Sequence, residues 1–270
     1  MPDPKTSLII ATMQRTGSSW LSAQLAATGV AGNPREWLQP ETILRWGVSH
    51  RLPVMKLQRA PQLALHRAGR RTHDERLFIK SVRPGSLPGY VAALRDAEST
   101  PNGVFAMQCH WDQWTLARDT WSLPASAFGP DQVWLHHWRE DRFEQAVSWT
   151  IARQSDQWNS TMRARSEPVY DADAVLLRFE LADRYHHEWL AYFAAHDIRP
   201  LQLTYEQLME DSPSRLHTIL SAISSEATAV TDDAPRLRIQ RDERSEEWLA
   251  RFTRDHAELL PRRFARPDER

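Results

Sequence analysis

Hydroxyl side chains and a single arginine gather in a short turn near the start of the sequence. The turn follows the apolar run at residues 8–11 and combines a positive charge, three hydroxyls and a glycine: Arg15, Thr16, Gly17, Ser18 and Ser19. A glycine lets the backbone approach a bound anion, and N–H groups at a helix N-terminus donate to phosphate oxygens. The pattern predicts an anion-binding turn in which Arg15 supplies the charge.

The residues on either side of the turn indicate which elements position it. The run at 8–11 is typical of a buried strand, and Trp20, Leu21 and Leu25 recur at the spacing of one helix face. The turn lacks the lysine of the G-x-x-x-x-G-K-[ST] motif, which disfavours a nucleoside triphosphate kinase. A serine that only caps a helix is the structural alternative for this turn.

The composition excludes several classes of protein. The length of 270 residues suits a single α/β domain, and 34 basic against 35 acidic residues predict no broad attraction to nucleic acid or to an anionic membrane. The lone Cys109 cannot form an internal disulfide and fits a reducing cytoplasm. No signal peptide or membrane span is recognisable, so we predict a cytoplasmic location.

Strand-like and helix-like segments alternate along the rest of the chain. Apolar runs at 103–108, 133–138 and 200–205 predict three further strands. Segments with helical spacing lie at 172–196 and 206–223. This alternation predicts an α/β fold with a central parallel sheet flanked by helices.

Two capping residues and one looser segment complete the predicted organisation. Asp141 is expected to cap a helix that begins at Arg142, and Ser245 to cap a helix near the C-terminus. Residues 39–97 are helical stretches broken by prolines, which we interpret as an insertion on the acceptor side of the site. Most of the twelve tryptophans are expected in the core.

Four blocks of the sequence resemble one family in both content and order. They are QRTGSSWL with ATGVAGNPREW, TPNGVF at 100–105, Arg139 with AVSW at 146–149, and Gln240 with RSEEW at 244–248. Together they are similar to the bacterial trehalose 2-sulfotransferase-like family, which uses 3′-phosphoadenosine-5′-phosphosulfate (PAPS). The resemblance implies a P-loop-like three-layer α/β fold. It also implies sulfuryl transfer to a hydroxyl of a trehalose-like carbohydrate or glycolipid acceptor.

The same resemblance implies where the donor binds. Arg139 and Ser148 are expected to hold the 3′-phosphate, with Arg244 as a second contact. The turn is expected to bind the phosphosulfate and to stabilise the leaving group without a metal. The donor residues implied in this way are Arg15, Thr16, Gly17, Ser18, Ser19, Trp20, Arg139, Ser148 and Arg244.

Two residues compete for the role of general base. The resemblance points to Glu36 in GNPREW at 32–37, because a carboxylate within reach of the acceptor hydroxyl can take its proton. His110 is the alternative, since Gln108-Cys109-His110 is similar to a Lys-Thr-His sequence of the cytosolic sulfotransferases. Gln108 stands where the related sequences have a lysine. We favour Glu36, with Arg15 as the charge that stabilises the transferred group.

The acceptor is expected beside the base. Amides and an aromatic face suit a polyhydroxylated ring, and we predict contacts from Gln14, Asn33, Glu36, Trp37 and Gln39. Adjacent histidines at 136–137 and 186–187 point in different directions and cannot act as a clamp, so no metal site is predicted. A homodimer is expected by analogy with the related enzymes.

Two other functions remain open from the sequence alone. A small-molecule kinase with a divergent loop would need ATP and Mg²⁺. A nucleotide- or sugar-binding protein without activity would explain the loss of the lysine at Gln108. Retention of Glu36, Arg139 and Ser148 favours the sulfotransferase.

Overall fold

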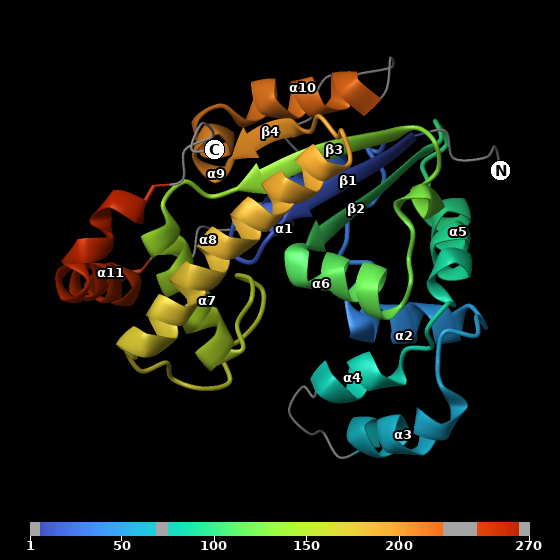
Figure 1. Cartoon of the computed structure of the whole chain (residues 1–270), viewed down its shortest axis with the longest axis horizontal. Helices are drawn as coiled ribbons and strands as arrows, with labels where there is room; N and C mark the ends of the chain where they lie inside the picture. The colour runs from blue at the N-terminus through green and yellow to red at the C-terminus, as the bar shows by residue number, and fades with distance from the viewer. Residues whose placement is uncertain (1–5, 69–74, 224–241, 265–270) are drawn as a thin grey trace.

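Four parallel strands form the centre of the computed structural model, which describes residues 6–68, 75–223 and 242–264. The strands are β1 (Thr6–Thr12), β2 (Val104–His110), β3 (Gln132–Trp138) and β4 (Leu201–Thr204), in the spatial order β2-β1-β3-β4 (Figure 1). Every pair in this sheet is parallel. The predicted parallel sheet is therefore confirmed, and its strands lie where the apolar runs indicated.

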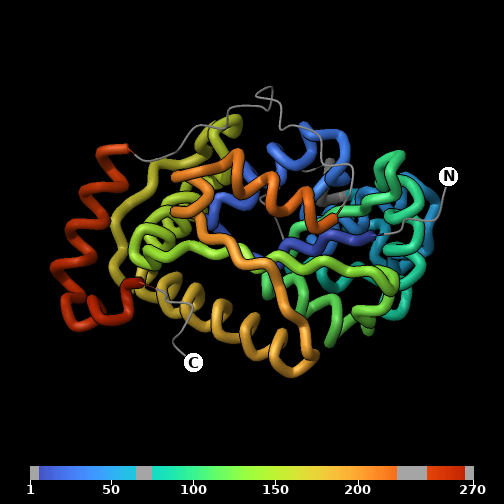
Figure 2. The backbone as a smooth tube through the Cα atoms, turned by 90° about the horizontal axis from the view of Figure 1, so that it is seen from above, coloured from blue at the N-terminus to red at the C-terminus, as the bar shows by residue number. Residues whose placement is uncertain are grey.

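Side chains of β1 alternate between two apolar layers, as the period of a strand requires. Leu8 and Ile10 join one buried cluster, whereas Ile9 and Ala11 join another. A parallel sheet is covered on both faces by its crossover helices, which makes its strands continuously apolar. Figure 2 shows helices on both sides of the sheet.

The first face is covered by helices that follow β1 and β4. Helix α1 (Ser18–Ala27) contributes Leu21 and Leu25, and α10 (Ser212–Ile223) contributes Leu216 and Leu220. The short α9 (Tyr205–Glu210) precedes α10. The sequence predicted one helix over 206–223, but the chain leaves the helical conformation at Asp211, whose φ is -146°. That residue separates α9 from α10.

Aromatic side chains fill the second face. Helices α6 (Trp111–Thr115) and α8 (Ala172–Ala195) cover it. The rings of Trp114 and Trp134 meet edge to face at 5.4 Å, and Trp189 stacks on Phe193 at 5.5 Å. All tryptophans except Trp20, Trp46 and Trp158 are buried, so the prediction that most lie in the core is confirmed.

Residues 39–97 form a group of helices beyond the edge strand β2. They contain α2 (Pro40–Ser49), the 3₁₀ turn η1 (Leu57–Arg59), α3 (Ala60–Ala68), α4 (Glu75–Ser81) and α5 (Leu87–Glu98). Figure 1 shows α3 and α4 far from the sheet, below α2. The segment η2 (Leu116–Thr120) and the turn η3 (Ala125–Phe128) connect α6 to β3.

Helix α7 (Arg142–Ser155) follows β3 and packs against α8 and α11 (Glu243–Asp255). The Asp141 carboxylate accepts from the backbone N–H of Glu144 at 3.0 Å, which confirms the predicted cap. The predicted cap at Ser245 is wrong. Asp242 caps α11, because its carboxylate accepts from both the N–H and the hydroxyl of Ser245. The turn η4 (Ala257–Arg262) ends the described chain, in which no helix is long and apolar enough to cross a membrane.

Candidate active site

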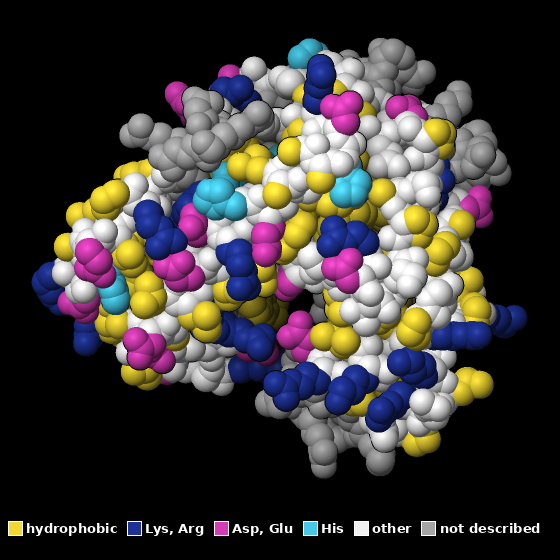
Figure 3. Space-filling model, in the orientation of Figure 1, with side chains coloured by type: hydrophobic (Ala, Val, Ile, Leu, Met, Phe, Trp, Pro, Cys, Tyr) yellow, Lys and Arg dark blue, Asp and Glu magenta, His cyan; other side chains and the backbone are white. Residues whose placement is uncertain are grey.

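A cleft of about 1980 Å³ opens where the strands end at their carboxyl edge. This edge is where open α/β sheets bind ligands, because loops there are displayed by rigid strands. Figure 3 shows the molecule hollowed near its centre on this face, with basic and acidic side chains around the hollow. The β1–α1 turn, α6, α7, α8 and α9 all contribute to the lining.

The β1–α1 turn brings the N-terminus of α1 to the cleft. Gly17 adopts a φ of +82° at the N-cap, and Arg15 is also left-handed at +65°. The first N–H groups of a helix have no carbonyl partner within it, and Ser18 and Ser19 at this end line the cleft. A Cβ on Gly17 would lie 2.7 Å from the Tyr205 ring, so a side chain at this position is excluded by packing as well as by φ.

Two guanidinium groups meet beside this turn. The Nε of Arg15 donates to the Ser148 hydroxyl at 2.9 Å, and its Nη1 donates to the Trp158 carbonyl. Arg139 lies over the Tyr205 ring at 4.6 Å and forms an ion pair with Glu144. Burial, and then the charge of Arg139, lowers the pKa of Arg15 to about 10. With this pKa Arg15 is cationic at neutral pH, so this end of the cleft attracts an anion.

A carboxylate with three polar neighbours lies elsewhere in the cleft lining. The two oxygens of Glu36 accept from Gln113 Nε2 at 2.6 Å and from Gln108 Nε2 at 3.2 Å. His110 Nδ1 lies 3.7 Å from Glu36 Oε2. The sequence treated Glu36 and His110 as competitors, whereas the fold places them in one cluster. Gln108 is part of the same cluster, and its amide oxygen accepts from the Ser22 hydroxyl at 2.8 Å.

Polar amides line the cleft beside that cluster. Gln14 donates to the Asp112 carboxylate at 3.2 Å, and its backbone carbonyl accepts from Gln145 at 2.7 Å. Gln39 lines the cleft while its side-chain oxygen caps α2 by accepting from the Thr42 N–H at 2.9 Å. Gln14 and Gln39 are thus brought together with Glu36, as the sequence predicted for residues that contact an acceptor.

Four residues of the sequence-based site do not line this cleft. The Trp37 indole is 2% exposed and donates to the Asn33 carbonyl at 3.2 Å, while Asn33 faces a separate small hollow. Thr16 is buried, and its hydroxyl bonds with that of Thr12. Arg244 pairs with Glu167 on the surface. Gln240, part of the fourth matching block, lies outside the described residues.

The sequence analysis missed several residues that the fold brings to the cleft. Gln113 holds Glu36, and Tyr205 packs on Gly17 beneath Arg139. Glu206 accepts from the backbone N–H of Glu140 at 3.0 Å and approaches Arg139. The signal that could have found Tyr205 and Glu206 is their position directly after β4, at the same carboxyl edge as the turn.

The paired histidines form a buried stack. His136 and His186 are nearly parallel at 5.1 Å, and neither His136 nitrogen has a hydrogen-bond partner among the residues described. Burial lowers the pKa of His136 to about 3 and that of His137 to about 4, so both rings are neutral. Within the described part of the chain, no group of three or more His, Cys, Asp or Glu residues is arranged to hold a metal.

Residues 7–255 match the family model described as Stf0 sulphotransferase. The chain belongs to this family. Its members are enzymes that transfer sulfuryl groups, which confirms the sulfotransferase prediction over the kinase and binding-protein alternatives.

Two curated relatives and one solved structure are similar over most of their lengths. The trehalose 2-sulfotransferase of Mycolicibacterium smegmatis is 27% identical over 281 residues, covering 94% of this chain and 97% of that protein. The trehalose 2-sulfotransferase of Mycobacterium tuberculosis is 28% identical, covering 91% and 93%. The sulfotransferase domain from the curacin biosynthetic pathway is 11% identical, covering 94% and 98%, with a TM-score of 0.47.

Proposed function

We propose that this sulfotransferase moves a sulfuryl group from PAPS to a hydroxyl of a carbohydrate acceptor. The observation that carries the proposal is the cleft itself. One cleft is lined both by two guanidinium groups beside a helix N-terminus and by a hydrogen-bonded carboxylate. Sulfuryl transfer needs these two functions, charge stabilisation and a base, within one site.

The donor would bind at the turn. The N-terminus of α1 and Arg15 would contact the 5′-phosphosulfate, and Arg139 with Ser148 would contact the 3′-phosphate. The Ser148 hydroxyl already accepts from Arg15, so both phosphate sites would share this guanidinium. Burial, and then repulsion from Arg139, lowers the pKa of Arg15, and an anion bound here would relieve that repulsion.

Glu36 would take the proton of the acceptor hydroxyl. The hydroxyl oxygen would attack sulfur at the same time, and the bond from sulfur to the leaving phosphate would break. Gln113 and Gln108 hold the carboxylate by donating to its two oxygens, and His110 lies behind it. Side-chain exposure supports Glu36 as the base: it is 34% exposed, whereas His110 is 9% exposed. His110 would then orient Glu36 or pass on its proton.

The relatives named as trehalose 2-sulfotransferases support a carbohydrate acceptor, and the amides of Gln14, Gln39 and Gln113 suit hydroxyl groups. We further propose a cytoplasmic location, a homodimer and transfer without a metal. Each follows from the sequence analysis and stays a prediction.

Calorimetric titration with 3′-phosphoadenosine-5′-phosphate (PAP), the product of the donor, tests the proposal. We expect metal-independent binding that Arg139→Ala weakens by roughly tenfold or more, because a charge-assisted contact is lost. ATP serves as the comparison ligand. Absence of PAP binding, or equal binding of ATP, would contradict the proposed donor site.

A further inference from the structure

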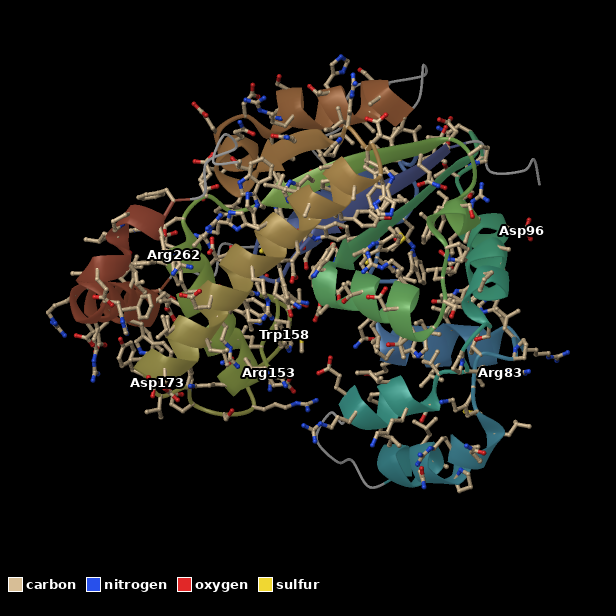
Figure 4. The ribbon with its side chains drawn as sticks, in the orientation of Figure 1. Arg83, Asp96, Arg153, Trp158, Asp173 and Arg262 are labelled. Atoms are coloured by element: carbon tan, nitrogen blue, oxygen red, sulfur yellow. The ribbon has the colours of Figure 1, made fainter. Side chains whose placement is uncertain are left out.

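Two arginines lie on the wall of the cleft away from the sheet. Arg153 is near the end of α7 and Arg178 is near the start of α8, and both line the cleft. Figure 4 shows Arg153 toward the lower end of α7 and Trp158 nearer the centre. Neither arginine forms an ion pair with a carboxylate of the described residues. Arg178 donates to the Ala174 carbonyl of its own helix at 3.2 Å.

These two charges are close enough to affect each other. Burial, and then the charge of Arg153, lower the pKa of Arg178, while the charge of Asp171 acts in the opposite direction. Asp156, another acid of the wall, is already engaged, because it pairs with Arg165 at 2.9 Å and accepts from the Trp158 indole at 3.2 Å. Two like charges in a concave wall, with one acid acting on them, are a site for an anion.

The two arginines line the same cleft in which the acceptor is proposed to bind. On α8, Tyr185, Leu181 and Arg178 all line the cleft, and burial, followed by the charge of Asp112, raises the pKa of Tyr185. Seven residues of helix separate Tyr185 from Arg178, a rise of about 10 Å along the helix axis. A substituted sugar or a disaccharide is long enough to extend along this part of the lining.

The cleft lining on the side of α4 includes Glu75, whereas the side formed by α7 and α8 contains Arg153 and Arg178. An anionic substituent is attracted toward the two arginines. Trp158 and Leu181 supply apolar surface on the same wall as the arginines, suited to the face of a sugar ring.

We propose that Arg153 and Arg178 bind an anionic group, a phosphate or carboxylate, on the acceptor carbohydrate. This inference rests on the proposed function, since it names the acceptor of that same site. The acceptor is then an acidic or phosphorylated saccharide rather than a neutral one.

The test compares trehalose with trehalose 6-phosphate and with a disaccharide containing glucuronic acid. Each is titrated into protein saturated with PAP, so that the donor's anion sites are filled. We expect at least one charged sugar to bind roughly tenfold to a hundredfold more tightly than trehalose, as charge-assisted hydrogen bonds imply. Which charged sugar benefits distinguishes phosphate from carboxylate.

Variants assign the effect to the pair. In the double variant of Arg153→Gln and Arg178→Gln, the preference for the charged sugar over trehalose should fall by the factor by which the wild type prefers that sugar. The single variants Arg153→Gln and Arg178→Gln should also reduce this preference. Arg199→Gln is the matched control, because Arg199 is exposed just before β4, at the end of the strand opposite the cleft. Inorganic phosphate, titrated into the same PAP complex and followed by tryptophan fluorescence, should bind the wild type more tightly than the double variant.

Two outcomes overturn the inference without touching the proposed function. Equal affinity for neutral and charged sugars, together with equal phosphate binding by wild type and double variant, would mean that the pair is a solvated surface. A loss of PAP affinity in the double variant would assign both arginines to the donor. Failure of PAP to bind the wild type would instead sink the proposed function.

Discussion

Glu36, the proposed general base, lies in a specific hydrogen-bonding environment. Both oxygens accept hydrogen bonds from amides, yet 34% of the side chain is exposed. Amide donors hold the carboxylate in place without adding charge that would compete for its electron pair. A lysine at position 108 would form an ion pair with Glu36, whereas Gln108 orients the carboxylate without neutralising its charge.

Glu36→Gln should lower kcat by about a hundredfold to ten-thousandfold, the usual contribution of a general base, with PAP affinity unchanged. The glutamine keeps the shape and can still bond with Gln113. Initial rates with a fixed acceptor, alongside PAP titration, check this. His110→Asn is the paired variant: if it reduces kcat more than Glu36→Gln does, His110 is the base.

The residues of the site were predictable from sequence only where their pattern is local. The turn at 15–19 and Arg139 each directly follow a strand, and parallel strands bring their carboxyl ends to one edge. The contact of Glu36 with Gln113 spans 77 positions and that of Arg15 with the Trp158 carbonyl spans 143. Such pairs depend on how helices pack on the sheet, which no local spacing specifies.

At the scale of the element, the N-terminus of α1 depends on a glycine that two constraints require. Gly17→Ala would force alanine into φ +82°, at a cost of about 1–2 kcal/mol, and would push a methyl group into the Tyr205 ring. We expect PAP affinity to fall at least tenfold, because the turn and Arg139 both contact that ring. Titration of the variant, with circular dichroism to verify folding, is the measurement.

The C-terminal helix α11 provides a direct comparison of two capping residues. Asp242→Ala should destabilise the protein by about 0.5–2 kcal/mol, because the carboxylate accepts from the Ser245 N–H and hydroxyl. Ser245→Ala should cost less, since the alanine keeps the backbone N–H. Urea unfolding of both variants decides the matter, and a larger effect at Ser245 would restore the sequence-based cap.

The sequence pattern predicted which segments are helical more easily than it predicted where each helix begins and ends. The segment at 206–223 has continuous helical spacing, and the break lies at Asp211, whose carboxylate accepts from the Ser214 N–H in the first turn of α10. The start of α11 was predicted with the same difficulty, because the helix begins at Glu243, before the expected cap at Ser245. Both differences involve which polar side chain satisfies the first N–H groups of a helix.

At the scale of the whole molecule, the core contains ionisable groups that the folded state cannot charge. His136 and His137 are fully buried on β3, and of the two it is His136 that stacks on His186 of α8. The Nδ1–H of His137 donates to the Leu203 carbonyl at 3.0 Å, which links β3 to β4 through a neutral ring. Protonation would place charge in an apolar layer beside Trp138 and Phe193.

This histidine stack predicts an acid-sensitive fold. The folded pKa values of His136 and His137 are lowered to about 3 and about 4, and that of His186 is lowered further by burial and by its neighbour His136. The unfolded chain takes up these protons near pH 6.5 and the folded chain does not. Stability is therefore full above pH 6.5 and falls as the pH drops, by about 1.4 kcal/mol per pH unit for each histidine.

In His136→Leu, the free energy of unfolding should fall less steeply between pH 6 and pH 5, by about 1.4 kcal/mol per pH unit, which corresponds to one proton. Most carboxylates titrate below this range. Urea unfolding at intervals from pH 8 to pH 5 measures the slope, and the exposed His217→Gln is the control. The comparison uses slopes rather than absolute stability, so a change in packing at position 136 does not obscure it. An unchanged slope in His136→Leu would mean that His136 already takes up a proton in the folded chain.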